Sequence, residues 1–228
     1  PITVSDQWGS VSCADAGDSN DDGVLVLLAE SAILAGRADE GLRILQQVSQ
    51  SEPSYEGKIT PAEIARVIAS LELVGMRIKA RAGNDQKKLK QVMDRTRSIG
   101  VLRDAGDLKV VLKWDHPDAA FDLSIKFPGS ELTEPSRSAP AMGLEWIVEK
   151  GLPAGDVLLQ VERAPGSVVK ESKAVLLVLL REGKDDEKVS KVAVDLTKKD
   201  RPKLAWSLSP DGKISEAKVE KGEPFPAL

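Results

Sequence analysis

The sequence predicts an α+β protein of two domains, in which four helices precede an antiparallel β-sandwich of seven or eight strands. Its 228 residues are 41% apolar, which is enough to bury two cores. Apolar residues recur every three or four positions up to residue 98, whereas after Gly100 they alternate in short segments. We therefore expect an acidic lead-in at residues 1–21, a helical domain at 22–104, a β-sandwich at 107–219 and a C-terminal tail at 220–228.

Four helical segments follow one another in the first domain. The first runs from Asp22 to a break at Gly36, and the others are expected at residues 40–50, 61–81 and 86–98. The third begins with a capping box, because Thr60 precedes Pro61 and Glu63 follows three positions after the threonine. The breaks between neighbouring segments indicate two helical hairpins.

Short segments with β-type alternation fill the second domain. The apolar run at 174–180 has no polar face, so we place that strand centrally in its sheet. Asp211-Gly212 is typical of a hairpin turn. The polar segment 128–140 is expected to be a loop, where binding residues often lie. The strands are expected at residues 108–114, 120–127, 144–150, 157–163, 173–181, 188–195, 203–209 and 213–219.

The first hairpin has small and large residues at a fixed spacing. They are Leu25, Leu28, Ala29, Ala32, Gly36, Gly41, Leu45, Val48 and Pro53. Over residues 22–55 this spacing resembles a tetratricopeptide repeat, with Ala32 in place of the usual aromatic residue and Gly41 in place of alanine. The resemblance implies a domain that binds proteins or positions its neighbours. We take Arg37, Arg77 and Arg81 as the candidate partner-binding residues.

Several short motifs mark the second domain. They are Val111–Asp115, Asp118–Leu123, Gly143-Leu144-Glu145 and Leu152–Val157. Over residues 107–195 these motifs resemble an uncharacterised bacterial β-sandwich family, which commonly follows von Willebrand and vault-type domains or helical repeats in exported proteins. Val157 and Ser124 differ from a tyrosine and a histidine that are frequent there. The resemblance implies a periplasmic, extracellular or envelope-associated location.

The composition argues against an enzyme. A single cysteine, Cys13, and a single histidine, His116, exclude disulfide frameworks and multi-histidine or cysteine-based metal sites. The sequence contains neither a nucleophile elbow nor a glycine-rich phosphate loop. The longest apolar runs, 23–29 and 174–180, are too short to cross a membrane. We expect no catalytic activity, no required cofactor and no membrane-spanning segment.

Two acidic segments are candidates for calcium. Asp115, Asp118 and Asp122 supply carboxylates beside the only histidine, and calcium prefers oxygen ligands. A turn around Pro117 explains the same residues without a metal. The segment 18–23 fits half of a calcium loop, but its twelfth position is Ala29 and not an acid, so helix capping is the preferred interpretation.

The distribution of charge and the positions of the tryptophans limit the classes of partner that we expect. Residues 1–60 have ten acidic and three basic side chains, whereas residues 61–105 have ten basic and five acidic ones. The basic segment contains no aromatic residue for stacking on bases, so we expect no nucleic-acid partner. Trp114, Trp146 and Trp206 fall in predicted strands and are either core residues or a platform for sugars.

Two functional hypotheses follow. The first is a non-enzymatic, exported or envelope-associated adaptor or scaffold that binds a protein partner through the helical domain. The alternative is a calcium-assisted β-sandwich module that binds carbohydrate or another cell-surface ligand. The solvent exposure of the three tryptophans distinguishes the two hypotheses, since a sugar platform must be exposed.

Overall fold

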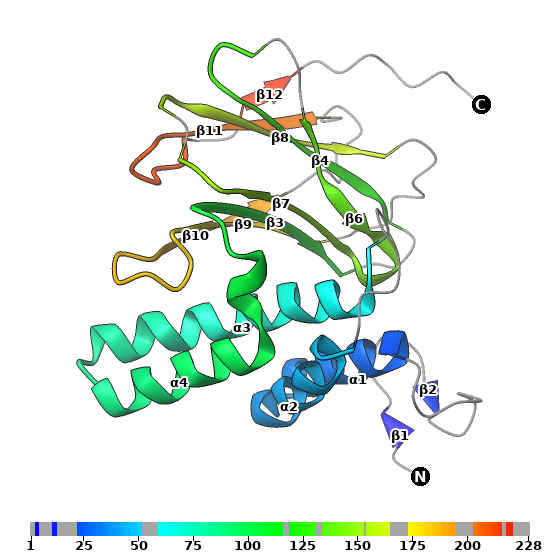
Figure 1. Cartoon of the computed structure of the whole chain (residues 1–228). Coiled ribbons are helices and arrows are strands. Elements are labelled where there is room, and N and C mark those ends of the chain that lie inside the picture. The colour runs from blue at the N-terminus through cyan, green and yellow to red at the C-terminus, as the bar shows by residue number, and fades with distance from the viewer. Residues whose placement is uncertain are drawn as a thin grey trace. The chain divides into compact units, whose positions relative to one another are not determined.

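The computed structural model has two compact units, Pro1–Asp104 and Ala105–Leu228 (Figure 1). It describes residues 3–4, 11–12, 22–51, 59–115, 119–130, 134–152, 154–164, 173–194, 203–215 and 218–220. Four helices precede two antiparallel sheets, which confirms the predicted α+β organisation in two parts. Most of the acidic lead-in and the C-terminal tail lie outside the described residues. Within the lead-in, β1 (Thr3–Val4) pairs with β2 (Val11–Ser12).

The helices of the first unit begin and end close to the predicted positions. The capping box is present, since Glu63 N donates to Thr60 Oγ1 (3.2 Å) and Thr60 N donates to Glu63 Oε2 (3.1 Å). Asp85 caps the last helix, and Gly100 ends it in the left-handed conformation (φ 76°). The elements are α1 (Asp22–Leu34), α2 (Ala38–Ser49), α3 (Pro61–Ala82), α4 (Gln86–Ile99) and the 3-10 turn η1 (Val101–Asp104).

Gly41 allows α1 and α2 to pack closely. A Cβ atom at this position would lie 2.6 Å from the Ala29 carbonyl oxygen and 2.6 Å from Ile33 Cγ1. Contacts this short are not tolerated, so the two helices reach this separation only because residue 41 has no side chain. The absence of the alanine that a tetratricopeptide repeat usually carries therefore has a local steric reason.

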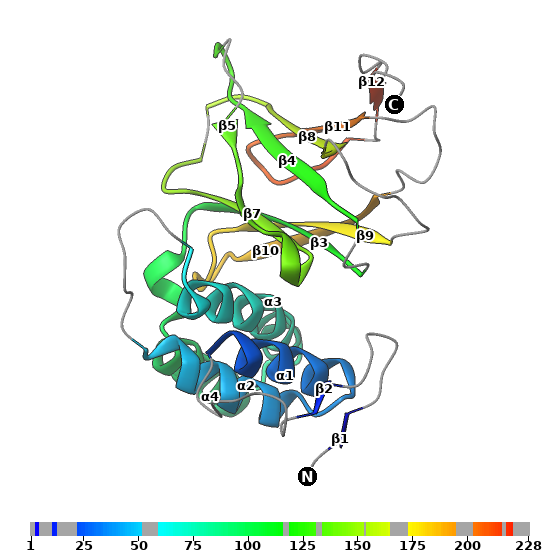
Figure 2. The ribbon, with the colours of Figure 1, turned by 90° about the vertical axis from the view of Figure 1, so that its right-hand side faces the viewer.

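The second unit is a sandwich of two five-stranded antiparallel sheets, seen as two facing layers in Figures 1 and 2. One sheet has the order β10-β9-β3-β7-β6, and the other has the order β12-β11-β8-β4-β5. The strands are β3 (Leu108–Trp114), β4 (Phe121–Lys126), β5 (Glu134–Pro135), β6 (Arg137–Ala139), β7 (Leu144–Glu149), β8 (Val157–Arg163), β9 (Ala174–Leu180), β10 (Lys188–Val194), β11 (Lys203–Leu208) and β12 (Lys218–Glu220), and the 3-10 turn η2 is Pro140–Met142.

Side-chain alternation places one face of each sheet in a common core. From β3 the core contains Leu108, Val110, Leu112 and Trp114, and it continues with Phe121, Leu123 and Ile125 from β4. The facing residues of β8 are Val157, Leu159 and Val161. β9 lies between β10 and β3, so it is an interior strand, as its two apolar faces predicted, and β3 occupies the middle of the sheet.

The segment 128–140 is more than a loop. It contains β5, which pairs with β4, and β6, which pairs with β7, so the chain crosses from one sheet to the other around Ser136. Strands of two and three residues are too short to show alternation, which is why the sequence indicated only a polar connection.

The last strand also differs from the prediction. Asp211-Gly212 does form a turn, and Leu208 bridges Ile214 beyond it. Beyond this bridge, Ser215 N donates to Ser207 O (2.9 Å) and Ser207 N donates to Ser215 Oγ (2.8 Å), and regular strand pairing resumes only at Lys218. β12 therefore covers Lys218–Glu220 and pairs with the first half of β11.

Candidate functional site

The three candidate partner-binding arginines lie in different environments. Arg37, in the turn between α1 and α2, is exposed and forms an ion pair with Glu40 (Nη1 to Oε2, 2.9 Å). Arg81 is partly buried near the end of α3. Arg77 is fully buried, and its Nη1 donates to Thr96 Oγ1 of α4 (3.1 Å). A buried arginine cannot contact a partner protein, so we withdraw Arg77 from the candidate surface.

A different feature of the helical unit is open to solvent. Two large apolar side chains of α1, Leu27 and Leu34, are 41% and 65% exposed. The opposite face of α1 contains Val26, Ala29 and Ala32, which are buried. The sequence did carry a signal for this surface, since α1 is apolar around most of its circumference and packs only one side within its unit.

The calcium candidates do not assemble into a site within the described residues. Asp115 follows β3, is exposed, and its Oδ1 accepts the N–H of Lys173 (2.7 Å). Asp122 is an exposed residue of β4, in the other sheet, opposite Glu162 of β8. Asp118 and His116 lie outside the described residues, as does most of the segment 18–23. Among those that are described, no group of three His, Cys, Asp or Glu side chains could hold a metal ion.

Asp122 lies beside a second carboxylate and a lysine. Partial burial and the neighbouring Glu162 carboxylate raise the pKa of Asp122 above its usual value. Lys203 of β11 stands opposite Glu162 on its other side, so a lysine of the same chain already lies beside this acidic pair.

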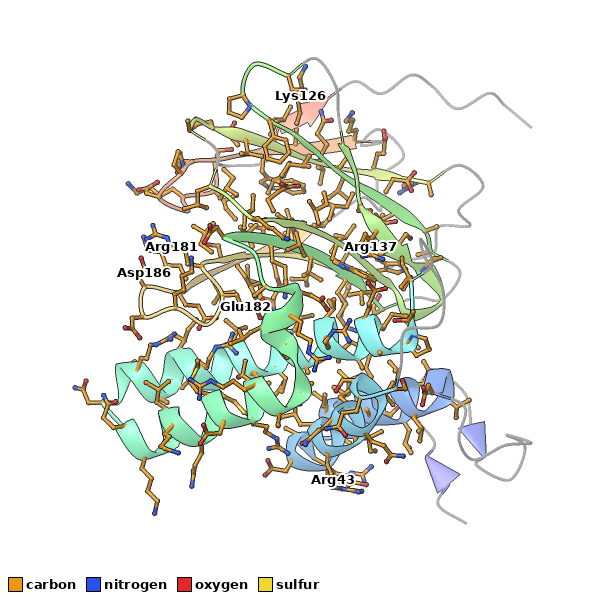
Figure 3. The ribbon with its side chains drawn as sticks, viewed as in Figure 1. Arg43, Lys126, Arg137, Arg181, Glu182 and Asp186 are labelled. Atoms are coloured by element: carbon orange, nitrogen blue, oxygen red, sulfur yellow. The ribbon has the colours of Figure 1, made fainter. Side chains whose placement is uncertain are left out.

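The three tryptophans are buried, and two of them, Trp114 and Trp206, belong to the core that the two sheets share. Trp114, Trp146 and Trp206 are 3%, 3% and 1% exposed, so they cannot form an open sugar platform. The Trp114 ring packs edge-on against Phe121 with centroids 5.5 Å apart. Arg137 of β6, labelled in Figure 3, lies 6.0 Å from the centre of the Trp146 ring, within the range of a cation–π contact.

Two buried acids of the sandwich have clear partners. Glu145 of β7 accepts hydrogen bonds from Leu123 N (2.6 Å) and Ser136 Oγ (2.7 Å), where the chain crosses between sheets. Burial raises the pKa of Glu145, and its hydrogen bonds act against that shift. Glu182 is fully buried and forms an ion pair with Lys109 of β3. These contacts explain the burial of both acids without a ligand.

The connection between β9 and β10 is held by charged side chains. Arg181 and Asp186, labelled in Figure 3, form an ion pair across this turn. Gly183 N donates to Glu187 Oε1 (3.0 Å), and Lys184 Nζ pairs with Asp107 (2.5 Å). These exposed pairs contribute little stability individually but define the shape of the turn.

One end of the sandwich contains polar groups that remain unsatisfied. Among the described residues, only three buried side-chain nitrogen or oxygen atoms have no hydrogen-bond partner: Trp114 Nε1, Arg163 Nε and Arg163 Nη2. Burial lowers the pKa of Arg163, because a charged guanidinium is disfavoured away from water. Arg163 is not among the predicted site residues, although it continues the core-facing alternation of Val157, Leu159 and Val161.

The basic surface of the helical unit carries internal ion pairs. Arg95 of α4 pairs with Asp39 of α2, and Asp94 contacts both Lys90 and Arg97 on its own helix. Arg66 pairs with Asp104 of η1. The pairs of Asp94 are exposed to solvent, whereas Arg66 is largely buried, and the absence of a nucleic-acid partner stays a prediction.

Comparison with protein-family models, with curated proteins and with solved structures finds no match for this chain. The resemblances to a tetratricopeptide repeat and to the bacterial β-sandwich family therefore stay predictions. Within the described residues, the helices are too short or too polar to cross a membrane.

Proposed function

We propose that this chain is a non-enzymatic adaptor or scaffold that binds a protein partner through its helical unit. The observation that carries the proposal is the outer face of α1, with Leu27 and Leu34 exposed. Single exposed leucines are common on protein surfaces, but these two lie seven positions apart and so on one face of the helix. Val24 and Leu28, both partly exposed, extend the same apolar strip.

The chemistry of this strip favours an apolar partner segment. Only Ser31 interrupts the apolar side chains at helical spacing between residues 24 and 34. The nearby Arg37 is paired with Glu40, so the end of the strip carries no net charge. A partner helix that presents apolar residues at positions i, i+3, i+4 and i+7 would fit it.

The alternative function, a calcium-assisted carbohydrate module, has less support. Its aromatic platform would need exposed tryptophans, and Trp114, Trp146 and Trp206 are buried. Its metal site would need Asp115, which follows β3 of one sheet, and Asp122, which lies in β4 of the other, to act together with Asp118.

We also propose a periplasmic, extracellular or envelope-associated location, which rests on the resemblance of residues 107–195 alone. Fractionation of the native host with an antibody to this chain tests it. Recovery with periplasmic, envelope or secreted markers is expected, and recovery with cytosolic markers only would contradict it.

Site-directed photocrosslinking in the native host tests the adaptor function. A photoreactive amino acid replaces Leu34 in the full chain, and a matched variant carries it at Ser98, an exposed position of α4. We expect a discrete crosslinked partner from position 34 that is absent from position 98. Leu27→Glu, combined with the label at 34, should reduce that product at least tenfold, because it places a charge within the apolar strip.

Two results would overturn the proposal. One is an equal product from positions 34 and 98, which would mean nonspecific collision. The other is a product from position 34 that Leu27→Glu leaves unchanged. Circular dichroism of each variant at 222 nm checks that the helices are intact.

A further inference from the structure

The unsatisfied donors of the sandwich gather at a single end. Trp114 is the last residue of β3 and pairs with Ala174, the first residue of β9. Arg163 is the last residue of β8 and pairs with Phe121, the first residue of β4. The two donor side chains therefore come from opposite sheets. Phe121 is paired with Arg163, and its ring lies 5.5 Å from that of Trp114.

Both side chains belong to the core-facing side of their sheets. Trp114 is part of the core cluster. Arg163 lies two positions after Val161, which is also in that cluster, and directly opposite Phe121, so it shares their face. Arg163 as a whole is only partly buried, but its Nε and Nη2 atoms are buried without a hydrogen-bond partner, which is unusual for a guanidinium and favours a bound acceptor.

The identity of the free atoms indicates the acceptor. Nε and Nη2 lie on the same edge of the guanidinium, and this edge binds the two oxygens of a carboxylate in parallel. The Trp114 indole N–H is a third donor and cannot accept a hydrogen bond. All three atoms are donors, which excludes a metal ion as their partner.

The charge of the donors favours a ligand with a single negative charge. The Arg163 guanidinium carries one positive charge and the Trp114 indole N–H carries none, so one carboxylate balances them. We propose that Trp114, Phe121 and Arg163 form a binding site for a carboxylate group of a peptide partner.

This site lies in the sandwich unit and does not depend on what binds α1. The carboxylate could be the C-terminus of the partner or an aspartate or glutamate side chain. Bidentate recognition by the free edge of Arg163 is common to both, so the experiment begins with acetate and then separates the two sources.

Nuclear magnetic resonance of the ¹⁵N-labelled full chain tests the proposal. The indole N–H signal of Trp114, assigned with Trp114→Phe, is followed while sodium acetate is added at constant ionic strength. We expect a saturable shift with a dissociation constant on the order of 1–10 mM, as befits a ligand of a few heavy atoms. Trp146 and Trp206 serve as internal controls, and their signals should not move.

Variants separate the guanidinium edge from its charge. Arg163→Lys keeps the positive charge but removes the paired donors, so it should weaken acetate binding at least tenfold. The control Arg137→Lys, at an exposed arginine beside Trp146, should leave the binding unchanged. Methyl acetate, a neutral ester of similar size, should cause no shift, and this titration decides the matter even if Arg163→Lys does not fold.

Two short peptides then identify the source. One has a free C-terminus and no acidic side chain, and the other is amidated and carries one aspartate; the peptide that shifts Trp114 at lower concentration names the source. The inference is overturned if the Trp114 signal ignores acetate, if sodium chloride or methyl acetate shifts it equally, or if binding survives in a folded Arg163→Lys. It is also overturned if acetate binds but neither peptide does.

Discussion

Arg77 in the helical unit and Arg163 in the sandwich both have buried donor atoms. They differ in whether an acceptor for these donors is present. Arg77 donates to Thr96, whose hydroxyl in turn donates to the Val92 carbonyl (2.8 Å), so α3 and α4 are joined through it. Arg163 presents two donor nitrogens, Nε and Nη2, without an acceptor. Burial alone therefore does not mark a binding residue. A buried donor atom with its acceptor in place is part of the fold, whereas one without an acceptor points to a ligand.

The same substitution at both arginines is the most direct test of this difference. Arg77→Met should lower the free energy of unfolding by about 2–4 kcal/mol, because it leaves buried polar partners unsatisfied. Arg163→Met should leave stability unchanged or raise it by about 1 kcal/mol, because it removes two buried donor atoms without a partner and keeps an apolar side chain of similar length.

Separate probes can follow the two units during denaturation by urea. Three of the four tryptophans lie in the sandwich, so fluorescence reports mainly on that unit, and circular dichroism at 222 nm reports on the helices. Equal losses of stability at both arginines would show that Arg163 has partners within the folded chain and would remove the basis of the comparison.

Two glycines of the helical unit provide a second test of close packing. Gly41→Ala should destabilise the helices by about 1–3 kcal/mol, because its Cβ would meet the Ala29 carbonyl oxygen at 2.6 Å. Gly75, within α3, has nothing within 4 Å of such a Cβ. Gly75→Ala should instead stabilise by about 0.5–1 kcal/mol through helix propensity, measured by thermal unfolding at 222 nm. Opposite signs are expected, and a matching sign would contradict the packing of α1 against α2.

Glu145 extends the comparison to a buried acid that has its partners. Its pKa in the folded chain is raised by burial above the ordinary 4.5, so the folded state binds the proton more tightly than the unfolded state. The contribution of Glu145 to stability is therefore greatest below pH 4.5 and decreases as the pH rises through the folded-state pKa. Relative to Glu145→Gln, the wild type should lose stability over that interval, as urea midpoints at several pH values would measure. A difference that is independent of pH would contradict the raised pKa.

The smallest effect on stability is expected at the proposed binding surface. Leu34 is 65% exposed, so Leu34→Glu should change the unfolding free energy by no more than about 0.5 kcal/mol. The buried Leu42 of α2 is the control, and Leu42→Ala should cost about 2–4 kcal/mol. A large loss at position 34 would mean that this leucine already packs against the folded chain.

Local signals predicted most of the fold. Thr60, Pro61 and Glu63 placed the start of α3, and alternation placed β3 and β8 at their observed bounds. β5 and β6 were missed, because such short strands are defined by their partners in β4 and β7 and not by their own sequence. These two strands form by pairing with segments that are distant in the sequence, and the local alternation of apolar residues does not predict such pairing.

The candidate site was harder to predict, and the reason is again physical. Arg77 falls on the face that contains Ser70, Leu73, Val74 and Ala80, so its burial could have been inferred from helical spacing. Arg163 likewise follows the core positions of β8. The spacing of residues within one helix or strand does not show whether a buried donor has an acceptor. The residue that lies opposite the donor, Thr96 for Arg77 and Phe121 for Arg163, belongs to another element.

The central claim, that the apolar face of α1 is a partner-binding surface, is tested most directly by backbone amide hydrogen exchange. The full chain is compared with and without the partner captured at position 34. We expect exchange to slow along α1, around Leu27 and Leu34, while the exposed face of α4 around Ser98 exchanges as before. Slower exchange in α4 alone, or no change in α1, would contradict the account.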